Sequence, residues 1–448
     1  MFKKIQRRFS HAQTLAIGHF LVILIGALLL MLPISSRSGT STDFLSSLFT
    51  STSATCVTGL VVVDTGTHWN FFGQLVIITL IQIGGLGFVT MGVLFSMFLN
   101  KKISLRTRGL LQDSLNVDKV GGVIRLVKKA LMGTLIIESI GAVLLMFRFI
   151  PEFGLQTGLW MSIFHSISAF CNAGFDILGS FFGAYSSLET YAGDVLINMV
   201  IMSLIVIGGI GFIVWADLLE HKWHFRKYRL HTKIVLVTTF ILIFGGAFLL
   251  YVFEKDAILA GRPIHEQILC CLFSSVTART AGFNSVDFGV VRQSSALLMC
   301  VLMYIGGSPG STAGGIKTTT VAVLFSSLFN SVRGHHDCNL FKRQVSKDTV
   351  RESSNVLIMT MTLALVSIMT ICAIQDLNML DVAFEVFSGL GTVGMTTGIT
   401  RDLVPVSRVI IILMMYLGRI GSMSFAYSFF EKKSVPAVQN PVEKVMVG

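Results

Sequence analysis

Long apolar runs alternate along the chain with basic segments and with shorter runs rich in serine and threonine. A helix needs about 20 apolar residues to cross a bilayer. Eight runs are long enough, at residues 14–32, 71–99, 130–150, 193–216, 232–253, 294–330, 353–374 and 407–430. Four shorter runs lie between the members of successive pairs, at residues 43–54, 158–170, 264–278 and 380–389. Runs of that length are more typical of re-entrant helices than of spans. The pattern therefore predicts four units of span, short helix and span.

The first run follows a basic tip and so resembles a signal peptide. No small-x-small cleavage site follows it, only Pro33-Ile-Ser-Ser, and it is long enough to span the bilayer. We interpret residues 14–32 as a retained first helix.

The four turns after the short runs share one shape, in which a glycine precedes a large apolar residue. The glycines are Gly59, Gly174, Gly282 and Gly394, which are separated by 115, 108 and 112 positions. Recurrence at this spacing in an apolar chain indicates one structural unit used four times around an axis. A lone glycine of this kind is more often an ordinary loop turn, whereas four copies in register favour a shared function.

These patterns together predict an all-α integral membrane protein. It would have eight transmembrane helices and four re-entrant pore helices in a pseudo-fourfold arrangement around one pore. The expected boundaries are 1–100, 101–220, 221–333 and 334–430 for the four repeats, and 431–448 for a cytoplasmic C-terminal tail.

Composition and charge agree with this interpretation. Of the 448 residues, 53% are hydrophobic and only 13% are charged, about half the share typical of soluble domains. The net charge of +11 would also suit nucleic acid, but 26 of the 35 basic residues fall in segments that the predicted spans place on one side. The positive-inside rule makes that side cytoplasmic, with both termini there. We therefore expect a multi-pass protein of the cell membrane that contacts lipids and not nucleic acid.

The opposite face is predicted to attract cations. Its segments carry acidic side chains, at Asp43, Asp64, Glu152, Asp176, Glu189, Asp194 and Asp287. A surface of this sign raises the local concentration of cations.

A cation that crosses a membrane must exchange its water for other oxygen ligands, and rings of backbone carbonyls supply them in potassium filters. Glycine reaches positive φ without steric cost, so it can turn successive carbonyls to one side. One glycine per repeat at the matching place fits such a K⁺-binding filter. Its predicted residues are Cys56, Val57, Thr58, Gly59, Cys171, Asn172, Ala173, Gly174, Arg279, Thr280, Ala281, Gly282, Gly391, Thr392, Val393 and Gly394.

The second span of each repeat also carries glycines. Gly84-Gly85 and Gly208-Gly209 are expected to permit close helix contact. The third repeat differs, because Pro309 and several glycines disfavour a continuous helix. We expect a loop that hangs into the pore below the filter, with a mere kink as the alternative. The predicted gate residues are Gly306, Gly307, Ser308, Pro309, Gly310, Ser311, Thr312, Ala313, Gly314, Gly315 and Lys317, together with Arg419.

Two arginines stand out at membrane depth, where a charge needs a partner or water. We expect Arg279 to form a salt bridge behind the filter. Arg419 lies inside an apolar span, and we expect it to face a cavity and to slow or gate ions together with the loop.

No other chemistry is predicted. The seven cysteines show no CxxC pair, and His335-His336-Asp337-Cys338 is expected to be a solvated loop and not a structural metal site. No enzyme motif or paired intramembrane carboxylates appear, so we expect a transporter and not an enzyme.

The motif set resembles the Trk/Ktr/HKT superfamily of potassium transporters over nearly the whole chain. The resemblance rests on the turns Thr58-Gly-Leu, Ala173-Gly-Phe, Ala281-Gly-Phe and Val393-Gly-Met, the broken Gly306–Gly315 segment and the late Gly418-Arg419. The given sequence starts at the first span of the first repeat, so it is most similar to the ion-conducting B subunits of bacterial Ktr systems.

The resemblance implies further expectations. It implies K⁺ uptake and a homodimer with one pore per protomer. It also implies an octameric cytosolic RCK partner (KtrA-like), and ATP or ADP would act only through that partner. It implies Na⁺ as a possible activator. Glycine at the first filter position, Gly59, goes with potassium and not with sodium transport in this superfamily. A sodium-coupled potassium symporter on the same fold stays open as the alternative.

Overall fold

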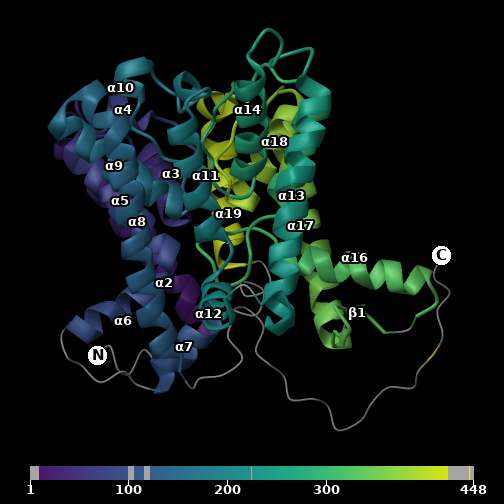
Figure 1. Cartoon of the computed structure of the whole chain (residues 1–448). Helices are drawn as coiled ribbons and strands as arrows, with labels where there is room; N and C mark the ends of the chain where they lie inside the picture. Colours follow the sequence, from purple (N-terminus) through teal and green to yellow (C-terminus); the bar gives the residue numbers. More distant parts are fainter. Residues whose placement is uncertain are drawn as a thin grey trace.

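A computed structural model describes residues 10–98, 105–115, 122–222, 224–335, 337–421 and Glu443. The chain is mostly helical (Figure 1). The first two repeats contain α2 (His11–Met31), α3 (Phe44–Thr55), α4 (Thr65–His68), α5 (Phe71–Leu86), α6 (Phe88–Phe98), α7 (Leu105–Leu115), α8 (Val123–Phe153), α9 (Leu155–Phe170), α10 (Gly179–Phe182), α11 (Val195–Gly209) and α12 (Phe212–His221).

The last two repeats follow the same order. They contain α13 (Leu230–Glu254), α14 (Ile264–Thr277), α15 (Gln293–Tyr304), α16 (Thr318–Val332), α17 (Lys347–Ile374), α18 (Met379–Gly391) and α19 (Pro405–Ile420). Short 3₁₀ segments lie at Pro33–Ser35, Glu189–Tyr191, Phe225–Lys227 and Ile399–Asp402. The predicted tail at 431–448 lies outside the described residues apart from Glu443.

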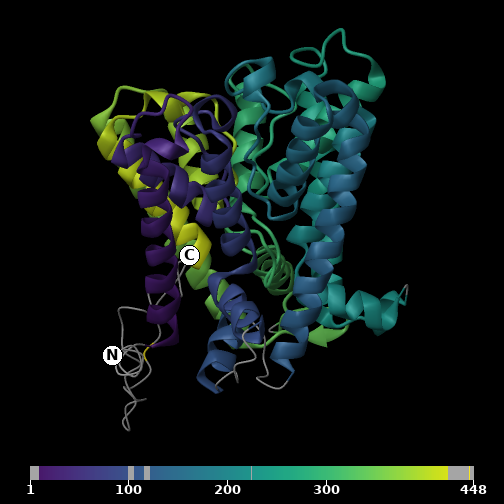
Figure 2. The ribbon, with the colours of Figure 1, turned by 90° about the vertical axis from the view of Figure 1, so that its left-hand side faces the viewer.

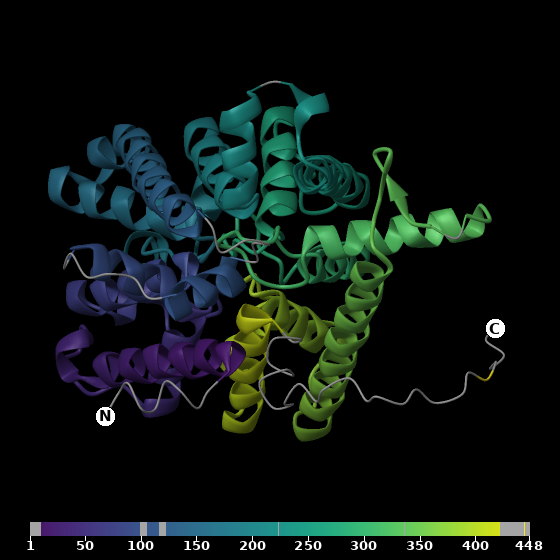
Figure 3. The same cartoon turned by 90° about the horizontal axis from the view of Figure 1, so that it is seen from below.

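The four units follow one another around a common centre. Figure 3 shows the purple, blue, teal and yellow-green units in this order. The purple α2 and the blue α8 stand roughly parallel on two sides of the molecule (Figure 2). The short helices α3, α9, α14 and α18 match the four predicted re-entrant helices to within three residues at either end.

Four helices of the described chain are long and apolar enough to cross a membrane: α2, α8, α13 and α17. They are the first helices of the four units. A fifth span results if α11 and α12, which meet at 96°, are counted as one. The chain is therefore a membrane protein, and the count of eight spans stays a prediction.

The second helix of a unit is broken more often than the sequence suggested. We predicted a break in the third unit alone, yet α5 gives way to α6 at Gly87 and α11 to α12 at Gly211. Both glycines have positive φ, 83° and 98°, a conformation that other residues reach only with strain. In the fourth unit α19 ends at Ile420, before Gly421 with φ of 89°.

Serine and glycine pairs hold the short helices of the first three units against the first helix of their unit. Ser51 Oγ donates to Ile23 O at 2.6 Å, and Ser166 Oγ donates to Glu138 O at 2.6 Å. In the third unit Ser275 Oγ donates to Ile243 O at 2.8 Å. Gly26, Gly141 and Gly246 face these serines, and a Cβ there would lie 2.5–2.6 Å from the hydroxyl oxygen. Small residues thus let the helices approach closely.

One segment departs from the all-helical prediction. Asn339–Leu340 and Arg343–Gln344 form a two-stranded antiparallel hairpin, β1 and β2. The hairpin follows α16, and Cys338 and Val345 pack with Val323 of that helix in a small apolar cluster. Of the expected solvated loop at 335–338, His335 and Asp337 are exposed, whereas Cys338 is buried because it packs on this helix.

Candidate ion pathway

The four repeated glycines face one another in a closed ring. Each lies against the carbonyl oxygen of the residue that precedes the glycine of the next repeat. The pairs are Gly59 with Ala173, Gly174 with Ala281, Gly282 with Val393 and Gly394 with Thr58. A Cβ built on any of the first three would lie only 2.5–2.6 Å from the facing oxygen. Four turns from distant parts of the chain therefore meet at one axis, and only glycine fits there.

A second left-handed residue stands two positions before each glycine. Val57, Asn172, Thr280 and Thr392 have φ of 58°, 60°, 70° and 52°, and the glycines have φ of 99°, 68°, 83° and 98°. The sequence predicted positive φ at the glycines only. Non-glycine residues seldom adopt this conformation, so its fourfold recurrence shows that the four turns share their backbone conformation at these two positions.

Hydroxyl groups of the short helices fix the turns. Gly59 N donates to Ser53 Oγ and Gly394 N donates to Ser388 Oγ, both at 3.0 Å. In the second turn Ser168 Oγ donates to Phe175 O at 2.7 Å. In the third, Thr277 Oγ1 donates to Phe283 O at 2.8 Å. Each turn is thus anchored by the helix that precedes it.

The third turn is one residue shorter than the others. Ala281 N bonds to the carbonyl four residues back, on Thr277. The corresponding bonds in the other turns reach five residues back, from Thr58 to Ser53, Ala173 to Ser168 and Val393 to Ser388.

The side chains at the start of the turns point into the scaffold. Cys56 and Cys171 are fully buried, and Arg279 is 5% exposed. The predicted salt bridge of Arg279 is wrong within the described part of the chain, where its guanidinium forms no ion pair and its Nε has no hydrogen-bond partner. The carboxylates nearest to Arg279 in the sequence have other partners, since Glu266 pairs with Arg262 and Asp287 accepts from Gly289 N.

The predicted loop of the third repeat is present between α15 and α16. A parallel bridge between Ile305 and Ile316 closes its base. Thr312 Oγ1 donates to Phe170 O, the last residue of α9, at 3.2 Å. A Cβ on Gly314 would touch the side chain of Thr392 in the fourth turn. The loop therefore lies directly beneath the ring of turns and is more than a kink.

The glycine pairs of the other repeats hold this loop. Ser308 N donates to Gly209 O at 3.0 Å, and Gly315 N donates to Gly418 O at 3.3 Å. Phe212 N, at the start of α12, donates to Gly310 O at 2.8 Å. Our expectation that the pairs serve helix contact alone is thus incomplete, because broken helices leave carbonyls free to accept from the loop.

Arg419 joins the loop to the first repeat. Its Nη1 donates to Thr312 O and its Nη2 donates to Gly84 O and, at 3.1 Å, to Gly85 O. Gly84 and Gly85 lie in the last turn of α5, where, within the described chain, the only backbone bond to Gly84 O comes from Gly87 N at 3.3 Å and the helix dipole is negative. The guanidinium therefore caps a broken helix and holds the loop at the same time.

A cavity of about 440 Å³ lies below the loop. Residues of all four repeats line it, among them His19, Phe212, Lys317 and Arg419. Lys317 Nζ donates to Ala313 O at 2.9 Å. Of the predicted gate residues, seven line this cavity: Pro309, Gly310, Ser311, Ala313, Gly315, Lys317 and Arg419.

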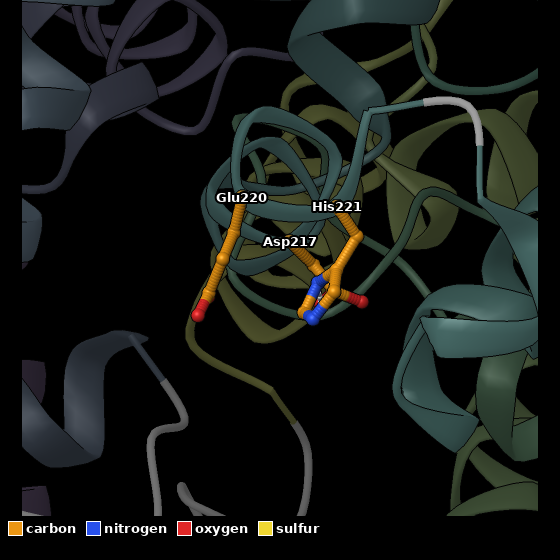
Figure 4. Close-up of side chains that lie close together, drawn as sticks. All are labelled: Asp217, Glu220 and His221. Atoms are coloured by element: carbon orange, nitrogen blue, oxygen red, sulfur yellow. Dashed lines mark hydrogen bonds and ion pairs between the residues drawn. The ribbon is translucent and has the colours of Figure 1, made fainter.

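One group of metal-capable side chains occurs among the described residues. Ligand atoms of Asp217, Glu220 and His221 lie within 4.8 Å of one another. Figure 4 shows Asp217 and His221 together, with Glu220 to one side. Asp217 Oδ1 lies 3.0 Å from His221 Nδ1, and Oδ2 accepts from Arg229 N at 3.0 Å. Because both carboxylate oxygens have protein partners, we interpret the group as a clamp between α12 and α13.

Comparison with known proteins agrees with this geometry. A family model described as TrkH, a cation transport protein, matches residues 3–436. The chain is 41% identical over 455 residues to the potassium/sodium uptake protein NtpJ of Enterococcus hirae, which covers 100% of this chain and 99% of that protein. It is also 41% identical over 443 residues to the Ktr system potassium uptake protein B of Bacillus subtilis, covering 98% and 97%.

A solved structure shares the fold. The crystal structure of the potassium transporter TrkH from Vibrio parahaemolyticus matches with a TM-score of 0.70 at 17% identity, covering 92% of this chain and 82% of that one. The fold and the candidate pathway together define a membrane protein that transports ions. The chain belongs to the TrkH family of cation transport proteins, so the expectation that it is not an enzyme is confirmed.

Proposed function

We propose that this protein takes up K⁺ across the cell membrane through the ring of turns at Gly59, Gly174, Gly282 and Gly394. One observation carries the proposal: each glycine lies against a carbonyl of the next repeat, and the four pairs close into a ring. Carbonyl rings replace the hydration shell of K⁺. The names of the two relatives, a potassium/sodium uptake protein and a potassium uptake protein, support the same ion.

The loop between α15 and α16 and Arg419 form the proposed gate. The loop lies between the ring and the cavity, and Arg419 holds it through Thr312 O. An ion could pass only if the loop moved aside, and loss of the Arg419 contacts would release it.

Regulation and assembly complete the proposal. We expect a homodimer on a cytosolic nucleotide-binding RCK ring, with ATP or ADP bound only by that partner. Na⁺ is a candidate activator. The basic segments and both termini would face the cytoplasm.

A second candidate function is Na⁺-coupled K⁺ symport. The name of the Enterococcus hirae relative, a potassium/sodium uptake protein, favours it. Coupling would make the zero-current voltage for K⁺ follow the Na⁺ gradient, whereas a channel-like pathway would follow the K⁺ gradient alone. Reversal potentials in planar bilayers separate the two.

The experiment that tests the filter is ⁸⁶Rb⁺ and ²²Na⁺ uptake by proteoliposomes. Native protein should prefer Rb⁺, and Gly59→Ser and Gly282→Ser should lose that preference because their side chains would strike a facing carbonyl. Gly245→Ser is the matched control, since a Cβ at Gly245 meets nothing within 4 Å. Unchanged preference in both filter variants would contradict the proposal.

A further inference from the structure

In three of the four repeats, a polar side chain at one recurring position joins the repeat to the next one. The position lies two residues before the glycines that precede each break, and it holds Gln82, Val206, Tyr304 and Tyr416. Tyr304 Oη bonds to Thr360 Oγ1 at 2.9 Å, on the first helix of the fourth repeat. Tyr416 Oη donates to Ala16 O at 2.7 Å, on the first helix of the first repeat. Each tyrosine thus links its own repeat to the next one around the axis.

Gln82 makes the corresponding link between the first and second repeats, and it differs from the tyrosines. Its Nε2 donates to Glu138 Oε2 at 3.2 Å, on the first helix of the second repeat. Its Oε1 accepts from Cys171 Sγ at 3.3 Å. The same thiol lies 3.9 Å from Glu138 Oε1. This link therefore reaches a residue of the ring of turns, whereas the tyrosine links do not.

Packing alone does not require a carboxyl group at this place. Ser166 donates to the backbone oxygen of Glu138, and the equivalent serines of the first and third repeats donate to Ile23 and Ile243. An apolar residue therefore serves at the same position in two other repeats. Glu138 is only 5% exposed, and a carboxyl group inside a membrane helix is costly unless it has partners and a role.

We propose that Gln82 and Glu138 are positioning residues that fix the second filter turn through Cys171 and thereby set ion selectivity. The inference rests on the proposed function of the ring as a filter. Cys171 begins the turn that presents the Ala173 carbonyl, and that oxygen faces Gly59. Loss of the link would let the second turn shift relative to the first, and a ring of unequal openings discriminates less well between ions.

The same link lies next to the proposed gate. Gln82 stands two residues before Gly84, whose carbonyl accepts from Arg419. A Cβ on Gly85 would lie 2.8 Å from Cys171 Sγ. A movement of Arg419 and of the end of α5 would therefore displace the second turn.

The test compares Rb⁺ and Na⁺ uptake by proteoliposomes of the full chain with variants of the link. The double variant Gln82→Leu with Glu138→Leu removes both partners at once, which keeps the cost to folding small because only the weak donor of the Cys171 thiol is left unpaired. We expect its Rb⁺ over Na⁺ preference to fall about tenfold, the effect of about 1.4 kcal/mol. Glu138→Gln keeps an acceptor for Gln82 and should retain native preference.

Tyr304→Phe is the matched control, because it removes a link between repeats that touches no filter residue. It should lower the unfolding temperature without changing ion preference. Native preference in the double variant, or an equal loss in Tyr304→Phe, would overturn the inference. Gly282→Ser in the same assay separates the two proposals: if it loses preference while the double variant does not, only the inference about the link fails.

Discussion

At the scale of single residues, position in the ring matters more than side-chain chemistry. Cys56, Cys171, Arg279 and Gly391 begin the four turns, so this position holds a thiol twice, a guanidinium once and no side chain once. The three side chains are buried in the scaffold. Each ring glycine faces a carbonyl of the next repeat, so no residue with a side chain fits at its position.

Arg419 gives a prediction at this scale. Arg419→Ala should raise Rb⁺ influx in the absence of any cytosolic partner, roughly tenfold if about 1.4 kcal/mol is removed from the barrier. The physical reason is that the loop loses its contact at Thr312 O and the end of α5 loses its cap. Uptake per mole of reconstituted protein measures the effect. Arg333→Ala, at an exposed arginine, is the control, and equal influx in both variants would contradict the gate assignment.

Asp176 gives a second prediction. It lies in the loop after the second turn, outside the predicted spans, where burial and the nearby charge of Asp64 raise its pKa to about 7. Its carboxyl group therefore loses its negative charge as external pH falls through about 7, and attraction of cations to the outer mouth weakens. We expect K⁺ uptake at low external K⁺ to fall between about pH 8 and 6. Asp176→Asn should show low uptake at every pH, without this step. A step of native size in the variant would show that another group causes the pH dependence.

At the scale of elements, the sequence predicted the short helices well. The run at 43–54 corresponds to α3, and the run at 264–278 corresponds to α14. Such helices can be recognised from the sequence because each is a short apolar run with serine and threonine and with clear ends. The breaks at Gly87 and Gly211 were missed. Hydropathy reports length and polarity only. The break at Gly211 is accompanied by hydrogen bonds to a loop more than 90 residues away, and the break at Gly87 by bonds to Arg419, more than 330 residues away.

Prediction of the candidate ion pathway from the sequence has the same limit. The glycines of the ring could be found by their spacing, and Arg419 by its charge in an apolar span. The partners of Arg419 could not be found, since backbone carbonyls become acceptors only where a helix is broken. Gln82 and Glu138 gave no signal, because each reads as one polar residue in an apolar helix.

The loop itself gives a prediction at the element scale. Phe212 N donates to Gly310 O and Asp217 clamps α12 to the start of α13. Asp217→Asn should weaken the clamp, loosen α12 and raise basal Rb⁺ influx, with Rb⁺ over Na⁺ preference unchanged because the ring is not touched. Glu220→Gln, on the same helix but without these bonds, should behave as native. Altered preference in Asp217→Asn would place the clamp in the filter and not in the gate.

At the scale of the whole molecule, α16 extends away from the bundle (Figures 1 and 3). One stripe of this helix is apolar and exposed, at Phe325, Leu328, Phe329 and Val332, with 56–78% of each side chain accessible. These residues recur at helical spacing, and such a stripe is typical of a surface covered by another chain. It fits the proposed homodimer.

Assembly can be tested on this stripe. Phe329→Ser with Val332→Ser should convert the detergent-solubilised protein from dimer to monomer, measured by light scattering after size exclusion. Phe240→Ser is the control, since Phe240 is equally exposed, at 62%, but lies on α13. A dimer in both variants would place the contact on another surface.

The central claim is that four carbonyl-lined turns form one K⁺ filter. The most direct measurement is anomalous difference density from crystals of the full chain grown with Tl⁺ or Rb⁺. The account predicts peaks on the axis of the ring, bounded by the carbonyls of Thr58, Ala173, Ala281 and Val393. Strong peaks elsewhere, with none on that axis, would contradict it.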